Sequence, residues 1–145
     1  MELDKKMLEE GEVFSPRFNK DGLILAISQE EKTGEVLMAA YMNQEALQET
    51  VKTGRAVFYS RSRGKLWRKG EQSGHFQKVR KIFTDCDQDC LLLKVEIDQG
   101  QCHVGYKSCF YREVLDDKSL KISDEKVYDP KEAYSKTNGE SGKQS

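Results

Sequence analysis

The residues best suited to chemistry lie in one short stretch, residues 85–90, which reads Asp-Cys-Asp-Gln-Asp-Cys. In an extended strand successive side chains point to opposite faces, so the three carboxylates would share one face and Cys86 would take the other. Carboxylates at this spacing repel one another unless a hard cation lies among them, and oxygen ligands of this kind suit Mg²⁺ or Ca²⁺. A thiol on the opposite face suits a softer metal such as Zn²⁺. A solvated acidic turn beside a buried cysteine is the alternative interpretation.

Two later thiols could complete a zinc site. A set of three, Cys86, Cys102 and Cys109, leaves the fourth position of zinc for water, which is typical of catalytic rather than structural sites. His103 adjoins Cys102 and, if both lie in a strand, it points to the opposite face and could act as a general acid or base. The alternative is that the cysteines are small buried apolar residues, because their spacing is not a CxxC pair.

A basic stretch with interleaved aromatic residues precedes the acidic one. Residues 51–82 contain ten Lys or Arg residues and a single acid, Glu71. Such an excess attracts phosphate, and an aromatic residue such as Trp67 could stack on a base. The stretch fits a small nucleotide, single-stranded nucleic acid, or a solvated face whose aromatic side chains turn into the core.

Length and composition set the frame for these sites. With 145 residues, 37% of them hydrophobic and 34% charged, the chain is expected to form one domain. Without an apolar run near 18 residues or the apolar core of a signal peptide, we expect a cytoplasmic protein that does not contact a membrane. Cysteines in that compartment are free thiols or metal ligands rather than disulfides. We expect a charged N-terminal segment (1–13), one catalytic domain (14–115) and a polar, flexible tail (116–145).

The hydrophobic pattern predicts a mostly β (α+β) domain with one clear helix. Strands are expected at residues 23–28, 35–41, 56–61, 75–84 and 91–97. The helix is expected at residues 43–53, with Asn43 as its N-cap and Gly54 as a left-handed C-terminal cap. Leu47 and Val51 lie one turn apart on its apolar face.

Four segments, in this order, resemble phosphoribosyl-AMP cyclohydrolases, the third enzymes of histidine biosynthesis: GEVLMAAYMNQEAL, SRSRGKLWRKGEQSGHFQKV, DCDQD and CHVGYKSCFYRE. The resemblance spans roughly residues 14–114. It implies a mixed β-sheet folded over into a half-barrel, and an intertwined homodimer. The implied zinc ligands, one ion per subunit, are Cys86 from one subunit and Cys102 and Cys109 from its partner. The implied magnesium ligands are Asp85, Asp87 and Asp89. Cys90 matches no ligand of the family and is expected to be a packed thiol.

The resemblance also implies a substrate and a reaction. The substrate is an adenine nucleotide with a second phosphoribosyl group on N1, and a water activated by zinc attacks C6 so that the N1–C6 bond opens. His103 is the candidate for moving the proton. The residues expected to bind the phosphate ends and the base are Arg61, Arg63, Lys65, Lys69 and Trp67. The rival function is a zinc-stabilised nucleic-acid-binding module, which has no use for three carboxylates that repel phosphate; we therefore expect no nucleic-acid partner.

Overall fold

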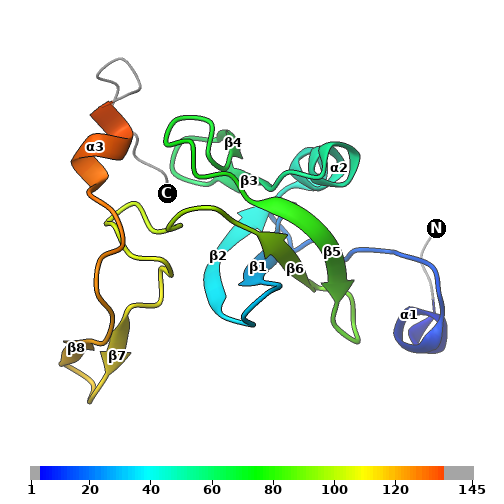
Figure 1. The fold of residues 1–145 in the computed structure, drawn as a ribbon. Coiled ribbons are helices and arrows are strands. Elements are labelled where there is room, and N and C mark those ends of the chain that lie inside the picture. The colour runs from blue at the N-terminus through cyan, green and yellow to red at the C-terminus, as the bar shows by residue number, and fades with distance from the viewer. Residues whose placement is uncertain (1–3, 136–145) are drawn as a thin grey trace.

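The computed structural model describes residues 4–135, which form a mostly β fold with short helices (Figure 1). The strands are β1 (Ile24–Glu30), β2 (Val36–Met42), β3 (Val57–Ser60), β4 (Lys65–Arg68), β5 (Lys78–Thr84), β6 (Cys90–Glu96), β7 (Arg112–Val114) and β8 (Leu120–Ile122). The helices are α1 (Lys5–Glu10), α2 (Gln44–Thr53) and α3 (Pro130–Ser135). All five predicted strand ranges overlap observed strands, so the prediction of a mostly β domain is confirmed.

A four-stranded mixed sheet, in the order β2-β1-β6-β5, forms the centre of the molecule. β1 is parallel to β6, and the outer pairs are antiparallel. Leu91, Leu93 and Val95 alternate along β6 and are all buried, as their spacing predicts. Because neither β2 nor β5 pairs with a further strand within residues 4–135, the sheet is not closed into a barrel; Arg55 forms only an isolated bridge to Lys78 of β5. The half-barrel stays a prediction.

Helix α2 covers the core with both predicted caps. The Asn43 side chain accepts a hydrogen bond from the first turn at 2.8 Å, and Gly54 ends the helix at φ 74°. Leu47 is buried, but the prediction that Val51 shares its apolar face is wrong, since Val51 is 62% exposed. Thr50 takes the inward position, because its hydroxyl bonds to the backbone of β3 as both acceptor and donor.

The β3–β4 hairpin packs on the same core from the basic stretch. Phe58 and Trp67 are cross-strand partners with ring centroids 5.4 Å apart, and both are buried. Arg61, Arg63 and Lys65 lie at the exposed turn of the hairpin. These two aromatic side chains therefore turn into the core while the cations stay in solvent, which was one of the three alternatives for this stretch.

The extended conformation expected for residues 85–89 is wrong. These residues form the turn between β5 and β6, and Gln88 has a φ of 57°. One carboxylate oxygen of Asp85 accepts hydrogen bonds from the N–H groups of Asp89 and Cys90, at 3.0 and 3.1 Å. A short acidic side chain that binds its own downstream backbone favours a turn over a strand.

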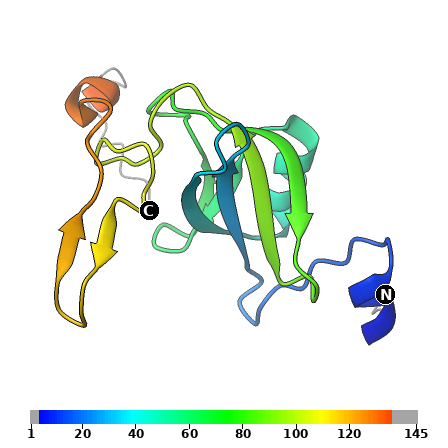
Figure 2. The ribbon, with the colours of Figure 1, turned by 60° about the horizontal axis from the view of Figure 1, so that its bottom comes forward.

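The C-terminal part of the chain carries a small β-hairpin, β7–β8, that projects from the body of the molecule (Figure 2). All residues of both strands are exposed. Flexibility of residues 116–145 stays a prediction, and residues 136–145 lie outside the described part. None of the described helices has the length and apolar character that a membrane crossing requires. The cytoplasmic location and the division into three segments stay predictions.

Candidate metal and substrate site

Three carboxylates come together in the turn between β5 and β6. One oxygen each from Asp85, Asp87 and Asp89 lie within 4.8 Å of one another. Within residues 4–135 this is the one group of three or more His, Cys, Asp or Glu side chains placed to hold a metal ion. A hydrogen bond with Asp89 lowers the pKa of Asp87, and the same bond raises the pKa of Asp89. Besides this bond, the raised pKa of Asp89 reflects repulsion among neighbouring carboxylates, which a divalent cation would relieve.

Gln88 attaches this acidic turn to the N-terminal segment. Its side chain is buried, with Oε1 accepting a hydrogen bond from Ser15 N at 2.7 Å and Nε2 donating to Leu8 O at 2.9 Å. The Gln88 carbonyl also accepts from Arg17 N at 2.7 Å. Gln88 was not among the residues predicted from the sequence; the available signal was a single uncharged side chain inside an acidic run.

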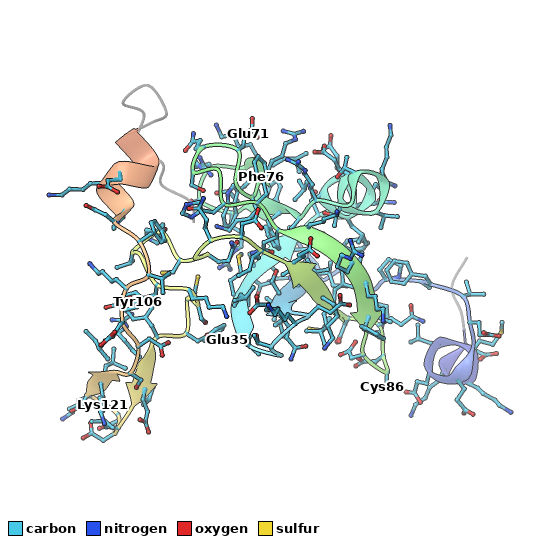
Figure 3. The ribbon with its side chains drawn as sticks, in the orientation of Figure 1. Glu35, Glu71, Phe76, Cys86, Tyr106 and Lys121 are labelled. Atoms are coloured by element: carbon cyan, nitrogen blue, oxygen red, sulfur yellow. The ribbon has the colours of Figure 1, made fainter. Side chains whose placement is uncertain are left out.

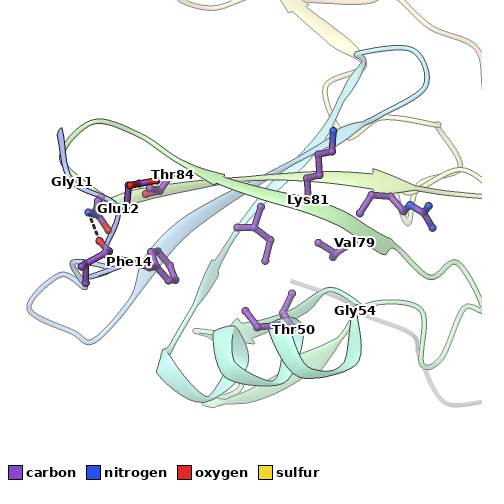
Figure 4. A pocket seen from close by; sticks show the side chains of 13 residues that line it. Gly11, Glu12, Phe14, Thr50, Gly54, Val79, Lys81 and Thr84 are labelled. Carbon is purple, nitrogen blue, oxygen red and sulfur yellow. Dashed lines mark hydrogen bonds between the residues drawn. The ribbon is translucent and has the colours of Figure 1, made fainter. Parts of the chain in front are cut away.

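A cavity of about 580 Å³ lies near this attachment, between residues 11–14, α2 and β5 (Figure 4). Phe14, Val51 and Val79 line it together with Lys81. None of the predicted site residues lines the cavity, so it is not part of the candidate site.

The other two candidate zinc ligands lie in the loop between β6 and β7, which is fixed against β2. Cys109 N donates to Leu37 O at 2.7 Å, and Ser108 Oγ donates to Val36 O at 2.7 Å. These bonds extend the hydrogen bonding of the sheet to the loop. The loop is therefore placed by the central sheet rather than by its own residues alone.

Cys102 itself lies in a tight turn. Its carbonyl accepts a hydrogen bond from Gly105 N at 3.0 Å, and its N–H donates to Tyr106 O at 3.0 Å. The strand assumed for Cys102 and His103 is therefore wrong. His103 is exposed and Cys102 is buried, so the two still face different surroundings.

Cys102 and Cys109 come together in the structure. A hydrogen bond from the Cys109 side chain lowers the pKa of Cys102 to about 6, and the same contact raises the pKa of Cys109. A hydrogen bond to the charged form favours that form, so the contact favours a thiolate at Cys102 over one at Cys109. The pair offers two sulfur ligands to a metal such as Zn²⁺.

Lys69 lies buried beside these thiols. Its side chain is 2% exposed and its Nζ donates to the Gln101 carbonyl at 2.9 Å. Burial lowers the pKa of Lys69 to about 8, while Cys109 and Cys102 act in the opposite direction. Lys69 is one of the cations expected from the sequence to bind phosphate. Its side chain is buried in the structure, and the phosphate-binding role stays a prediction.

A buried network of polar side chains connects the central sheet to the loop that carries Cys102 and Cys109. Gln77 is fully buried; its Oε1 accepts from Ser28 Oγ at 2.7 Å, and its Nε2 donates to Gln101 Oε1 at 3.1 Å. The network joins β1 to the residue that precedes Cys102. Sequence analysis missed both glutamines, because nothing in their spacing distinguishes a buried amide from an exposed one.

Cys86 lies far from the thiol pair within one chain. It is exposed in the turn between β5 and β6, and Figure 3 shows it on the opposite side of the sheet from Tyr106, which belongs to the loop of Cys102. The three predicted zinc ligands therefore do not meet within one chain. Cys90, at the start of β6, is half-buried, and burial raises the pKa of its thiol.

Two polar pockets adjoin the predicted substrate-binding residues. One, of about 240 Å³, is lined by Arg63, Lys65 and Trp67 among others. The Nε1 donor of Trp67 is buried and finds no hydrogen-bond partner among the described residues. The other, of about 360 Å³, is lined by residues that include Arg17, Tyr41 and Asp89. The Arg61 guanidinium lies 4.5 Å from the centroid of the Tyr41 ring.

Comparison with known proteins gives one consistent family. The family model described as phosphoribosyl-AMP cyclohydrolase matches residues 38–111. A phosphoribosyl-AMP cyclohydrolase of Methanothermobacter thermautotrophicus is 53% identical over 123 residues, which cover 83% of this chain and 88% of the relative. That of Chloroherpeton thalassium is 55% identical over 123 residues, covering 84% and 88%. That of Methanosarcina acetivorans is 56% identical over 115 residues, covering 79% and 92%. On these matches the chain belongs to the phosphoribosyl-AMP cyclohydrolase family of hydrolases.

Proposed function

We propose that this protein is a phosphoribosyl-AMP cyclohydrolase that opens the N1–C6 bond of an N1-phosphoribosylated adenine nucleotide, as a step of histidine biosynthesis. The observation that carries the proposal is the family match over residues 38–111, which contains every predicted ligand and basic residue. Nothing in the arrangement of residues 4–135 favours the alternative of a zinc-stabilised nucleic-acid module. Three clustered carboxylates would repel a nucleic-acid backbone.

The chemistry of the donor groups fits two different cations. Cys102 and Cys109 supply soft sulfur ligands with one thiolate already favoured, which suits zinc, one ion per subunit. Asp85, Asp87 and Asp89 supply hard oxygen ligands within 4.8 Å of one another, which suit magnesium. When zinc is bound it supplies Lewis acidity that lowers the pKa of a water molecule towards neutrality.

The chain's own residues would then position the substrate and move the proton. His103 is exposed beside Cys102, so its imidazole is free to reach solvent and a bound nucleotide. The exposed cations Arg61, Arg63 and Lys65 would hold phosphate. Trp67 is buried against Phe58, so we assign it to the wall of the 240 Å³ pocket. There its Nε1–H, which has no hydrogen-bond partner among the described residues, would donate a hydrogen bond to an oxygen of the substrate.

A homodimer would complete the zinc site. Cys86 of one subunit would join Cys102 and Cys109 of the other, because one chain does not bring the three together. The exposed apolar side chains of the projecting hairpin support a partner, since Val114, Leu120 and Ile122 are all more than half exposed. A two-stranded hairpin is also marginally stable in water by itself. The half-barrel expected from the family resemblance is compatible with a dimer of this kind.

Turnover of phosphoribosyl-AMP, followed by ultraviolet absorbance as the purine ring opens, tests the function. Zinc- and magnesium-loaded protein should turn over, and Cys109→Ser should not. A folded, zinc-loaded parent protein without turnover would refute the assignment.

Subunit mixing tests the shared site. Cys86→Ser and Cys109→Ser should each be inactive, yet refolding them together in equal amounts should restore about a quarter of wild-type activity, since half the dimers then carry one intact site. A zinc site contained within one chain predicts no recovery.

A further inference from the structure

The segment that follows β8 lies against the turn that carries Cys102. Figures 1 and 2 both show the chain between β8 and α3 running beside the loop between β6 and β7. The Tyr128 hydroxyl donates a hydrogen bond to the Cys102 carbonyl, and Val127 N donates to the Gly105 carbonyl at 2.8 Å. These two bonds hold the turn at its first and last residues.

Two glycines allow this close approach. Gly105 has a φ of 113°, and a side-chain carbon placed there would lie 2.8 Å from the Tyr128 carbonyl oxygen. A side-chain carbon at Gly100 would lie 2.7 Å from Val127 Cγ2 and 3.0 Å from the Tyr128 ring. An addition at Gly105 would push against Tyr128, and one at Gly100 against both Val127 and Tyr128. Glycines on both sides of Cys102 therefore fit a chain segment packed directly on the backbone.

Tyr128 also contacts the body of the molecule. Its ring meets that of His75 edge-on, with centroids 4.5 Å apart and planes at 83°. His75 is buried in the connection between β4 and β5, the same connection that begins with Lys69. One side chain thus joins the Cys102 turn to the connection on which the buried ammonium lies.

We infer that residues 127–128 form a strap that positions the Cys102 turn for metal binding, with Tyr128 as a positioning residue. The inference rests on the proposed thiolate site, and it adds a residue outside the matched range 38–111. Tyr128 acts through the Cys102 carbonyl, because a fixed backbone presents the sulfur towards Cys109 before metal arrives. Ligands that are already ordered cost less to bind, and partners that orient a ligand commonly set metal affinity.

Full-length Tyr128→Phe tests the strap, because it removes the hydroxyl donor and keeps the ring on His75. Tyr59→Phe is the matched control, since none of the described residues 100–130 is hydrogen-bonded to the Tyr59 hydroxyl. Zinc affinity, measured by competition with a chromophoric chelator, should fall about fivefold in Tyr128→Phe, as expected for one hydrogen bond, and stay unchanged in the control. Magnesium affinity, measured by thermal shift, should be unchanged in both.

A second readout needs no metal. Cys102 is 3% exposed, so alkylation of the metal-free protein should be slow at this residue, faster in Tyr128→Phe and fastest in Tyr128→Ala. Peptide mass analysis separates Cys102 from the exposed Cys86 and Cys109.

Equal zinc affinity and equal Cys102 alkylation in wild type and Tyr128→Phe overturn the strap. Loss of both metals together also overturns it, because that result means general destabilisation. The metal site and the strap can be refuted independently. Wild-type protein that binds no zinc at its thiols refutes the metal site, and the alkylation measurement still shows whether Tyr128 holds the Cys102 turn.

Discussion

Replacing Lys69 by methionine should remove a specific pH dependence of stability. The side chain is 2% exposed, and burial lowers its pKa from 10.5 to about 8. Between these values the unfolded chain binds more protons than the folded one, so folded stability rises with pH across this window. A difference of this size corresponds to about 3 kcal/mol of destabilisation at neutral pH, relieved as Lys69 loses its proton.

Urea unfolding of metal-free, reduced protein at pH 7, 8, 9 and 10 measures the effect. Between pH 7 and pH 10, the free energy of unfolding of the wild type should rise by roughly 2 to 3 kcal/mol more than that of Lys69→Met. Lys65→Met, at an exposed position, is the control and should follow the wild type. Cys102 and Cys109 are electrostatically coupled to Lys69, so the difference between wild type and Lys69→Met reports the lysine together with this coupling. Parallel curves for wild type and Lys69→Met would refute the reasoning.

The same variant connects stability to function. Opposite charges that lie close together favour each other's charged forms. The buried Lys69 ammonium therefore stabilises the thiolate forms of the two neighbouring thiols, which are the forms that bind a metal. Lys69→Met should therefore bind zinc about 10- to 100-fold more weakly. Unchanged zinc affinity would show that the ammonium serves another role, such as the phosphate binding expected from the sequence.

Three other predictions address the acidic turn, the substrate and the core. Magnesium at 100 times its Kd should stabilise the wild type by about 2.7 kcal/mol in thermal shift, and Asp87→Asn should lose most of this gain. Arg17→Gln should raise the KM for substrate about tenfold with little change in kcat, because Arg17 lines the pocket that contains Asp89; an unchanged KM would exclude Arg17 from binding. Leu93→Ala removes a fully buried side chain from β6 and should cost about 3 to 4 kcal/mol in urea unfolding.

The sheet and the helix could be predicted because their evidence is local. Leu93 and Val95 alternate with the polar Lys94 and Glu96 along β6, and Asn43 and Gly54 mark the ends of α2. Burial of Lys69 could not be predicted, because a lysine in a basic run is more often exposed, and its partner Gln101 lies 32 positions away. Tyr128 was missed for the same reason, since it reaches Cys102 across 26 positions from a polar segment.

In the acidic turn, a wrong prediction of local structure still brought together three residues that the structure also brings together. Strand alternation would put Asp85, Asp87 and Asp89 on one face, whereas the observed turn gathers them by curving the backbone around Asp85. Cys86 is not part of the group of ligand atoms that lie within 4.8 Å of one another. Its soft sulfur also suits a different cation from the hard carboxylates.

This separation constrains where the two metals would lie in the proposed dimer. Cys86 stands between Asp85 and Asp87 in the sequence, so a zinc ion held by Cys86 would lie next to the carboxylate cluster of the same subunit. If the partner supplies Cys102 and Cys109, its Lys69, which is buried beside those thiols, also comes near this acidic turn. One subunit would thus bring the carboxylates and one thiol, and the other would bring two thiols and a buried cation. The substrate would be held between opposite charges at the interface, and neither chain would be complete by itself.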